Sequence, residues 1–204
     1  MLDLILASGS PRRKLLLEML GLNFSVIPAE VDEPEPDGEE PATYAEYLAE
    51  MKAAHVADQQ RSSVVVGADT IVVLGDVVLG KPKDKTQAVD MLASLSGRTH
   101  RVITGISLQK TDNHNNIIKK SSFHVTTQVT FSRLSQDEIL KYIETGSPFD
   151  KAGGYGIQDD LGALFVERID GCYYNVVGFP VNRFYNEMKS FEPQIFQHLS
   201  QNTL

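Results

Sequence analysis

The chain opens with Leu2-Asp3-Leu4-Ile5-Leu6-Ala7-Ser8-Gly9-Ser10-Pro11-Arg12-Arg13-Lys14, an apolar strand that passes straight into the start of a helix. Ser10 suits a helix N-cap, and Pro11 falls at the first helical position, where its missing N–H costs nothing. Such a helix start attracts anions, and the fork geometry of Arg12 and Arg13 suits phosphate. We therefore predict an anion-binding strand–loop–helix. The alternative is an ordinary helix start with a solvated basic first turn.

Composition limits the class of protein. The 204 residues, 42% hydrophobic and 23% charged, suit one globular domain over 1–204, although the tail after about residue 193 has no assigned place. No apolar run approaches a membrane span, and because the sequence begins with a strand and a capped helix we expect no secretory signal. A single cysteine, Cys172, excludes an internal disulfide framework, so we expect a cytoplasmic protein. The net charge of −8 argues against nucleic acid as a partner.

Strand and helix patterns interleave along the chain. Strands are expected at 23–28, 64–66, 71–74, 77–79, 101–108, 123–131 and 163–169, with polar loops at 29–40 and 111–120. The expected helices start at the capping pairs Thr43/Glu46 and Ser135/Glu138 and at Asp84 or Thr86, and a last one carries Phe184, Met188 and Phe191. The first helix is expected to bury Leu15, Leu16, Met19 and Leu20. The pattern predicts an α/β fold with a mixed sheet flanked by helices.

Carboxylates occur at two places that suit a site. Asp69 follows the valine-rich strand 64–66, and ligands gather at the carboxyl ends of strands in open α/β sheets. A carboxylate there binds a divalent metal or orients a water as a base, unless it only closes an Asx-turn. Asp32 and Glu33 lie in the acidic loop 29–40, where one of them would supply an oxygen ligand to Mg²⁺. The alternative for that loop is a solvated acidic surface.

Two lysines and one glutamine complete the candidates. Lys81 stands between a glycine and a proline that would fix its ammonium in space, although from this segment alone an ordinary surface lysine is the safer interpretation. Lys52 lies at the edge of an expected apolar helix face, where it either snorkels or points into a cleft. That face consists of Tyr44, Tyr47, Leu48, Met51 and His55. Gln158 lies in the glycine-rich loop 153–162, and its amide offers both a donor and an acceptor to a base edge. The alternative is a flexible loop.

Short motifs in a fixed order resemble the Maf family of nucleoside triphosphate pyrophosphatases. The motifs are Leu6–Arg13, Gly67–Thr70, Gly80–Pro82, Leu95–Gly97, Asp150–Gly153, Tyr155–Gln158 and Val176–Pro180. The resemblance runs from Leu4 to about Met188. It implies a fold similar to the inosine triphosphate pyrophosphatases, with two lobes around a cleft. It also implies cleavage of the α–β phosphoanhydride to a monophosphate and pyrophosphate with a divalent metal, Mg²⁺ or Mn²⁺.

The resemblance also implies roles for residues at matching positions. Asp69 is the expected general base, Glu33 and Lys81 line the same site, and Glu33 and Asp69 are the expected metal ligands. The residues expected around the phosphates are Ser8, Arg13 and Lys52. The residues that match the subgroup acting on dTTP and UTP, rather than on 7-methyl-GTP, are Arg12, Thr70 and Gln158. Asp159 and Asp160 depart from the pattern by lengthening the loop after Gln158.

A second functional hypothesis stays open beside hydrolysis. The family is also associated with nucleotide-binding regulation of cell division or septum formation, in which turnover would be incidental. A third hypothesis, removal of modified pyrimidine nucleotides, differs from the first only in substrate. The expected partner is a nucleoside triphosphate rather than nucleic acid or a membrane. The oligomeric state stays open, with a homodimer as one candidate because dimers are common among such enzymes.

Overall fold

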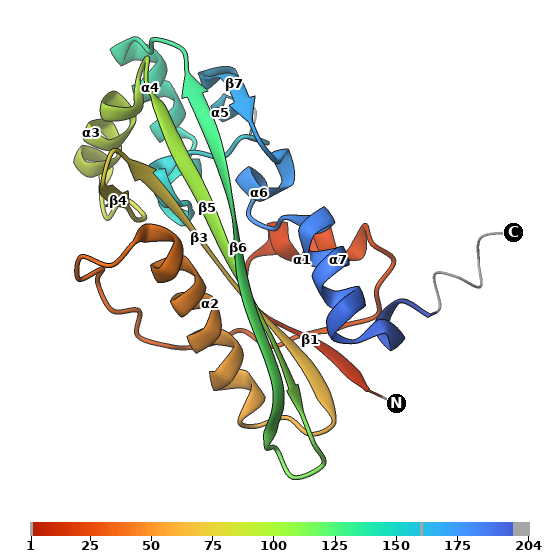
Figure 1. Cartoon of the computed structure of the whole chain (residues 1–204). Coiled ribbons are helices and arrows are strands. Elements are labelled where there is room, and N and C mark those ends of the chain that lie inside the picture. The colour runs from red at the N-terminus through yellow and green to blue at the C-terminus, as the bar shows by residue number, and fades with distance from the viewer. Residues whose placement is uncertain (1, 160, 198–204) are drawn as a thin grey trace, which may run out of the picture. The chain divides into compact units, whose positions relative to one another are not determined.

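The computed structural model describes residues 2–159 and 161–197 (Figure 1). The strands are β1 (Asp3–Ala7), β2 (Ser25–Val26), β3 (Ser63–Leu74), β4 (Val77–Leu79), β5 (Thr99–Thr111), β6 (Ile117–Phe131) and β7 (Val166–Asp170). The helices are α1 (Pro11–Glu18), α2 (Pro41–Ala57), α3 (Lys85–Leu95), α4 (Gln136–Glu144), α5 (Gly162–Phe165), α6 (Tyr173–Val177) and α7 (Val181–Phe191). Short 3₁₀ helices cover Ser147–Asp150 (η1), Ala152–Gly154 (η2) and Pro193–Phe196 (η3). Asp160 and residues 198–204 lie outside the described residues, so the expectations for Asp160 and the tail stay predictions.

The strands form one mixed sheet, which confirms the predicted fold class. Their order is β2-β1-β3-β5-β6-β7, and β4 pairs with β3. β1 runs parallel to β2 and β3, whereas the β3–β4 and β6–β7 pairs are antiparallel. The β3–β4 pairing of Leu74 with Val77 leaves Gly75 and Asp76 as a two-residue turn, as predicted. In the described part of the chain, no helix is long and apolar enough to cross a membrane.

The chain divides into two compact units, in keeping with the expected two lobes. The described residues of the first unit are 2–69, 104–125 and 178–197, and those of the second are 70–103, 126–159 and 161–177. Strands β3, β5 and β6 contribute residues to both units. The expected cleft between the lobes and the single domain over 1–204 stay predictions.

Most capping and core predictions for the second unit are confirmed. Asp84 is the N-cap of α3 and accepts a hydrogen bond from the backbone N–H of Gln87. Ser135 and Glu138 form the predicted capping box of α4. The core gathers apolar side chains from α3, α4 and the strands, including Leu92, Leu95, Phe131, Ile139, Tyr142 and Phe165. Periodicity identified α3 because it buries a single apolar stripe, whereas the capping box identified α4.

The stripe predicted for α1 is confirmed at Leu16 and wrong at Leu15 and Met19. Leu16 and Leu17 are buried, whereas Leu15 and Met19 are 60% and 63% exposed. Arg13 lies three and four residues before the two buried leucines and therefore shares their face. Its inward hydrogen bonds, described below, set the rotation of the helix. The spacing of the apolar residues favoured the wrong face because it takes no account of Arg13, whose side chain points inward.

Several boundaries also differ from the predictions. The strand expected at 163–169 begins as the helix α5, and the strand itself, β7, starts only at Val166. The strand expected at 23–28 is reduced to Ser25–Val26.

α2 begins at Pro41, so Thr43 lies inside the helix rather than at its N-cap. β3 is continuous across Gly67–Thr70, so Asp69 lies within a strand and not after one. The loop predicted at 111–120 is a short turn, because Asp112 accepts hydrogen bonds from the backbone N–H groups of His114 and Asn116 and β6 resumes at Ile117. The first residues of β6 are exposed, which explains why a polar sequence forms a strand there.

A buried histidine in the second unit predicts how stability depends on pH. His100 is 2% exposed, its Nε2 lies 2.8 Å from the Tyr155 hydroxyl, and burial lowers its pKa to about 4. In the unfolded chain, His100 has an ordinary histidine pKa near 6.5 and binds a proton below that pH. In the folded protein the same side chain stays neutral down to a much lower pH. As pH falls from about 6.5 to 4, we expect His100 to remove about 3 kcal/mol of unfolding free energy.

Urea unfolding from pH 7.5 to 4.5 measures this effect, with His100→Gln as the comparison. Glutamine keeps a polar group for Tyr155 but does not titrate, so the variant should lose less stability over the same range. Equal losses in the two proteins would contradict the assignment to His100.

Candidate active site

The first turn of α1 is organised by Ser8 rather than by Ser10. Ser10 stands at the N-cap position, but among the described residues its side chain makes no capping hydrogen bond. The Ser8 hydroxyl instead accepts from the backbone N–H of Ser10, at 3.3 Å, and from Nη1 of Arg13, at 3.0 Å. Ser8 is buried, so its hydroxyl is held as part of the strand-to-helix turn.

Arg13 donates hydrogen bonds to three segments of the first unit. Its Nη1 donates to the carbonyl of Ala68 at 2.8 Å as well as to Ser8, and its Nε donates to the carbonyl of Gly178 at 3.0 Å. Burial lowers the pKa of Arg13, and the nearby Asp69 charge opposes that change. The guanidinium stays charged because an arginine pKa begins far above neutral pH. The anion-binding turn is thus fastened to β3 next to Asp69.

Close packing of α2 against β3 places Lys52 over the strand. A Cβ atom built on Gly67 would lie 2.1 Å from the carbonyl oxygen of Ala49 and 2.9 Å from Cβ of Ala53. On β5, a Cβ at Gly105 would lie 2.2 Å from the carbonyl oxygen of Ala45. The inner face predicted for α2 is confirmed at Tyr44 and Leu48, which are buried, but Tyr47 is 49% exposed and alanines complete the buried face. Small residues on both surfaces let the helix backbone approach the sheet.

The ammonium of Lys52 joins two carboxylates. Its Nζ lies 2.5 Å from Oδ1 of Asp69 and 2.6 Å from Oε1 of Glu33. Asp69 is 8% exposed, whereas the Glu33 side chain is half exposed on the acidic loop. Of the two alternatives for Lys52, the structure shows the one that directs it inward. Two carboxylates predicted from separate segments are thus brought to one point.

Burial raises the pKa of the Asp69 carboxyl above its ordinary value. The positive charges of Lys52 and Arg13 oppose that rise, and the Lys52 hydrogen bond adds to their effect. A carboxylate with a raised pKa is a stronger base than a solvated one. The Asx-turn alternative for Asp69 is wrong, because the residue lies inside β3.

Tyr44, which sequence reasoning assigned only to an apolar face, holds the acidic loop. Its hydroxyl donates to the carbonyl of Pro34 at 2.8 Å, directly after Glu33 in the chain. Burial, together with the negative charges of Asp69, Glu33, Glu35 and Glu39, raises the pKa of Tyr44 to about 12. The tyrosine therefore stays protonated and keeps donating at neutral pH. The signal in the sequence was a polar-tipped aromatic on a helix next to the loop.

The two carboxylates fit a divalent cation. Their oxygens converge on one positive group, Nζ of Lys52. Hard cations such as Mg²⁺ take carboxylate oxygens, often one or two from the protein with the rest from substrate phosphates and water. Within 2–159 and 161–197, no cluster of three or more His, Cys, Asp or Glu could hold a metal. A metal here would therefore depend on the bound substrate for its remaining ligands.

The remaining candidates are placed as follows. Arg12 is half-buried on α1, next to Arg13. Thr70, Lys81 and Gln158 belong to the second unit. Thr70 is half-buried in β3, while Lys81 and Gln158 are exposed. The carbonyl of Gly80, beside Lys81, accepts from the backbone N–H of Gly153 at 3.0 Å, which joins the Lys81 segment to the glycine-rich loop.

A family profile, several full-length relatives and a solved structure are similar to this chain. A family profile described as Maf-like protein matches residues 3–191. A dTTP/UTP pyrophosphatase of Ruminiclostridium cellulolyticum is 46% identical over 97% of this chain and 100% of the relative. Another from Bacillus cytotoxicus is 47% identical over 92% and 95% of the two chains. Among solved structures, a HAM1 protein from Coxiella burnetii aligns with a TM-score of 0.43 and 20% identity, over 66% of this chain and 75% of that one.

Proposed function

The chain belongs to the Maf-like protein family, and we propose that it is a pyrophosphatase that hydrolyses dTTP and UTP to the nucleoside monophosphate and pyrophosphate. The observation that carries the proposal is the meeting of Asp69 and Glu33 at Lys52, beside the basic turn of Ser8 and Arg13. Carboxylates suited to metal binding and to general-base catalysis therefore lie next to cationic groups suited to phosphate binding. Two relatives named dTTP/UTP pyrophosphatase match this chain over nearly their whole length, which supports dTTP and UTP as the substrates.

In the proposed reaction, Asp69 is the general base. A water oxygen bonds to phosphorus, the Pα–O–Pβ bond breaks, and its electron pair stays on the bridging oxygen of the departing group. Asp69 takes the proton from the water. The hydrogen bond from Lys52 fixes the orientation of the carboxylate, and burial strengthens it as a base. A Mg²⁺ or Mn²⁺ ion held by Asp69 and Glu33 would neutralise phosphate charge and acidify water.

The cationic groups of the first unit bind the phosphates in this proposal. Hydrolysis moves negative charge onto the leaving pyrophosphate, so fixed cations stabilise the transition state more than the ground state. Lys52 contributes an ammonium, and Arg13 contributes a guanidinium whose position is set by its bonds to Ser8, Ala68 and Gly178. The Ser8 hydroxyl completes the turn.

Base recognition in the proposal rests on Gln158 of the second unit. Uracil and thymine present an N–H donor beside a carbonyl acceptor, and the Gln158 amide offers the complementary pair. Arg12, on α1 of the first unit, and Thr70 of the second are the further residues proposed to select dTTP and UTP, and Lys81 of the second unit is proposed as a further catalytic cation. A cytoplasmic location and a homodimer stay predictions.

Chelation should abolish activity reversibly. Two carboxylates bind a divalent cation weakly without the substrate, so dialysis against EDTA is expected to strip the metal. UTP turnover, followed by pyrophosphate release, should fall to background and return on adding Mg²⁺ or Mn²⁺. The thermal unfolding midpoint should change little, because Lys52 already compensates both carboxylates. Full turnover after chelation would remove the metal from the proposal.

A panel of triphosphates tests the substrate. The kcat/KM values for dTTP and UTP should exceed those for CTP, ATP and GTP, and a base-modified pyrimidine triphosphate tests the wider pyrimidine range. A preference for a purine triphosphate would contradict the assignment of Gln158.

A further inference from the structure

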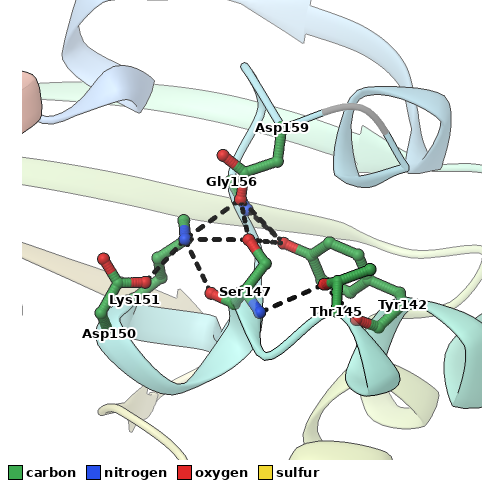
Figure 2. Close-up of polar contacts among 7 residues, drawn as sticks. All are labelled: Tyr142, Thr145, Ser147, Asp150, Lys151, Gly156 and Asp159. Carbon is green, nitrogen blue, oxygen red and sulfur yellow. Dashed lines mark hydrogen bonds and ion pairs between the residues drawn. The ribbon is translucent and has the colours of Figure 1, made fainter.

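A buried lysine in the second unit stands at the centre of a polar cluster that the proposed reaction does not use. Lys151 is 8% exposed, and its Nζ lies 2.6 Å from Oδ1 of Asp150 and 3.1 Å from Oδ2 of Asp159. It also donates to the carbonyl and the hydroxyl of Ser147, at 2.7 and 3.0 Å (Figure 2). The ammonium is therefore surrounded by oxygen acceptors.

Asp159 is the member of this cluster that belongs to the glycine-rich loop. Besides the Lys151 ion pair, its Oδ2 accepts from the hydroxyl of Ser147 and from the hydroxyl of Tyr142, the latter at 3.2 Å. The Tyr142 hydroxyl in turn accepts from the backbone N–H of Gly156 at 3.0 Å. Figure 2 shows these groups converging from α4, η1 and the loop. Tyr142 and Lys151 thus hold both ends of the segment 156–159.

The same segment is closed on itself and tightly packed. The backbone N–H of Asp159 donates to the carbonyl of Gly156 at 3.1 Å. A Cβ at Gly156 would lie 2.5 Å from Oδ2 of Asp159 and 2.7 Å from Cε of Lys151. Gln158 lies inside this turn and is exposed. Gln158, which is proposed to contact the base, therefore lies in a turn between Gly156 and Asp159, and both of these residues are held by hydrogen bonds.

The cost of burying Lys151 indicates that the cluster does more than stabilise the fold. Removing a lysine from water costs several kcal/mol, and well-packed apolar side chains often match or exceed the stability of a buried ion pair. The hydrogen bonds of this cluster depend on direction as well as distance, which an apolar contact does not. The side chain fixed here, Asp159, is the next residue after Gln158.

We propose that Lys151 is a positioning residue for base selection, acting through Asp159 to hold the 156–159 turn so that Gln158 meets the base in one orientation. The inference rests on the proposed function, in which Gln158 reads uracil or thymine. Uracil presents a donor at N3 and an acceptor at O4, and cytosine presents the reverse pair. A glutamine amide suits either base when it is free to move, so its support decides the selection.

The test is the ratio of kcat/KM for UTP to that for CTP. Lys151→Met keeps length and apolar volume but removes the ammonium, and should lower the ratio by about tenfold or more. The loss should come mainly from a higher KM for UTP, with a smaller change in kcat. Asp159→Asn, a milder change, should lower the ratio in the same way if Lys151→Met does not fold. Lys141→Met, at an exposed lysine of α4, is the matched control and should keep both the ratio and the melting temperature.

A double variant separates positioning from a general loss of structure. If Lys151 acts through Gln158, then Lys151→Met combined with Gln158→Ala should select no less well than Gln158→Ala alone. Additive losses, or an unchanged ratio in Lys151→Met, would overturn the inference and leave the proposed reaction standing. A wild-type protein that hydrolyses UTP without discriminating against CTP would also overturn it. A wild-type protein that releases no pyrophosphate from UTP would remove the proposed function first.

Discussion

Replacing Asp69 by asparagine is expected to lower kcat for UTP by about 10³-fold or more, because it removes the proposed base and one metal ligand together. The change preserves the shape of the side chain, and an amide oxygen still accepts from Lys52. Steady-state release of pyrophosphate at saturating UTP and Mg²⁺ measures the loss. Asp76→Asn, in the exposed turn between β3 and β4, is the matched control and should keep full activity.

We expect the Asp69→Asn variant to lose activity without losing thermal stability. Because burial raises the pKa of Asp69, the ionised carboxylate is less favourable in the folded protein than in the unfolded chain. At neutral pH that charge lowers stability, so a neutral asparagine should leave the melting temperature the same or higher. A large fall in melting temperature would mean that the lost activity reports unfolding. Unchanged activity would remove Asp69 as the base.

Adding a single methyl group at Gly67 is expected to damage both the fold and the site. Alanine there places its Cβ 2.1 Å from the carbonyl oxygen of Ala49, a backbone atom that moves only with α2. Overpacking of this kind should lower the unfolding free energy by about 3 kcal/mol or more. Any protein that still folds must carry α2 away from β3. A displacement of about 1 Å at Lys52 would lower kcat by about 100-fold.

Gly80→Ala is the control for the substitution itself. A Cβ at Gly80 has no described atom within 4 Å, so this variant should unfold at the same urea concentration as the wild type. The two glycine variants are compared by urea unfolding at pH 7.5. Equal stability of Gly67→Ala and the wild type would show that α2 does not depend on this close approach.

The sequence predicted elements whose signals are local. The capping box at Ser135, the turn at Gly75 and the apolar stripe of α3 each depend on a few neighbouring residues, and all are confirmed. The alternating burial of β6 from Phe123 to Phe131 was also readable, because one face of that stretch is buried. The mixed α/β class followed from the order of these elements.

The features that depend on distant residues were not predicted. The rotation of α1 depends on Arg13 reaching Ala68 and Gly178, which lie far along the chain. The alanines of the inner face of α2 pack against Gly67 and Gly105 on the strands beneath it. The Asp69–Lys52–Glu33 cluster was predicted residue by residue, but its geometry joins three separate segments. Tyr44 and Lys151 were missed as polar anchors because their partners lie in loops.

Product identification tests the central claim most directly. Wild-type protein is incubated with UTP and Mg²⁺, and the products are separated by anion-exchange chromatography at several early times. The account predicts UMP and pyrophosphate in equal amounts from the first time point, with their appearance lost in Asp69→Asn. Release of UDP and orthophosphate would place the cleavage at the other phosphoanhydride and contradict the account.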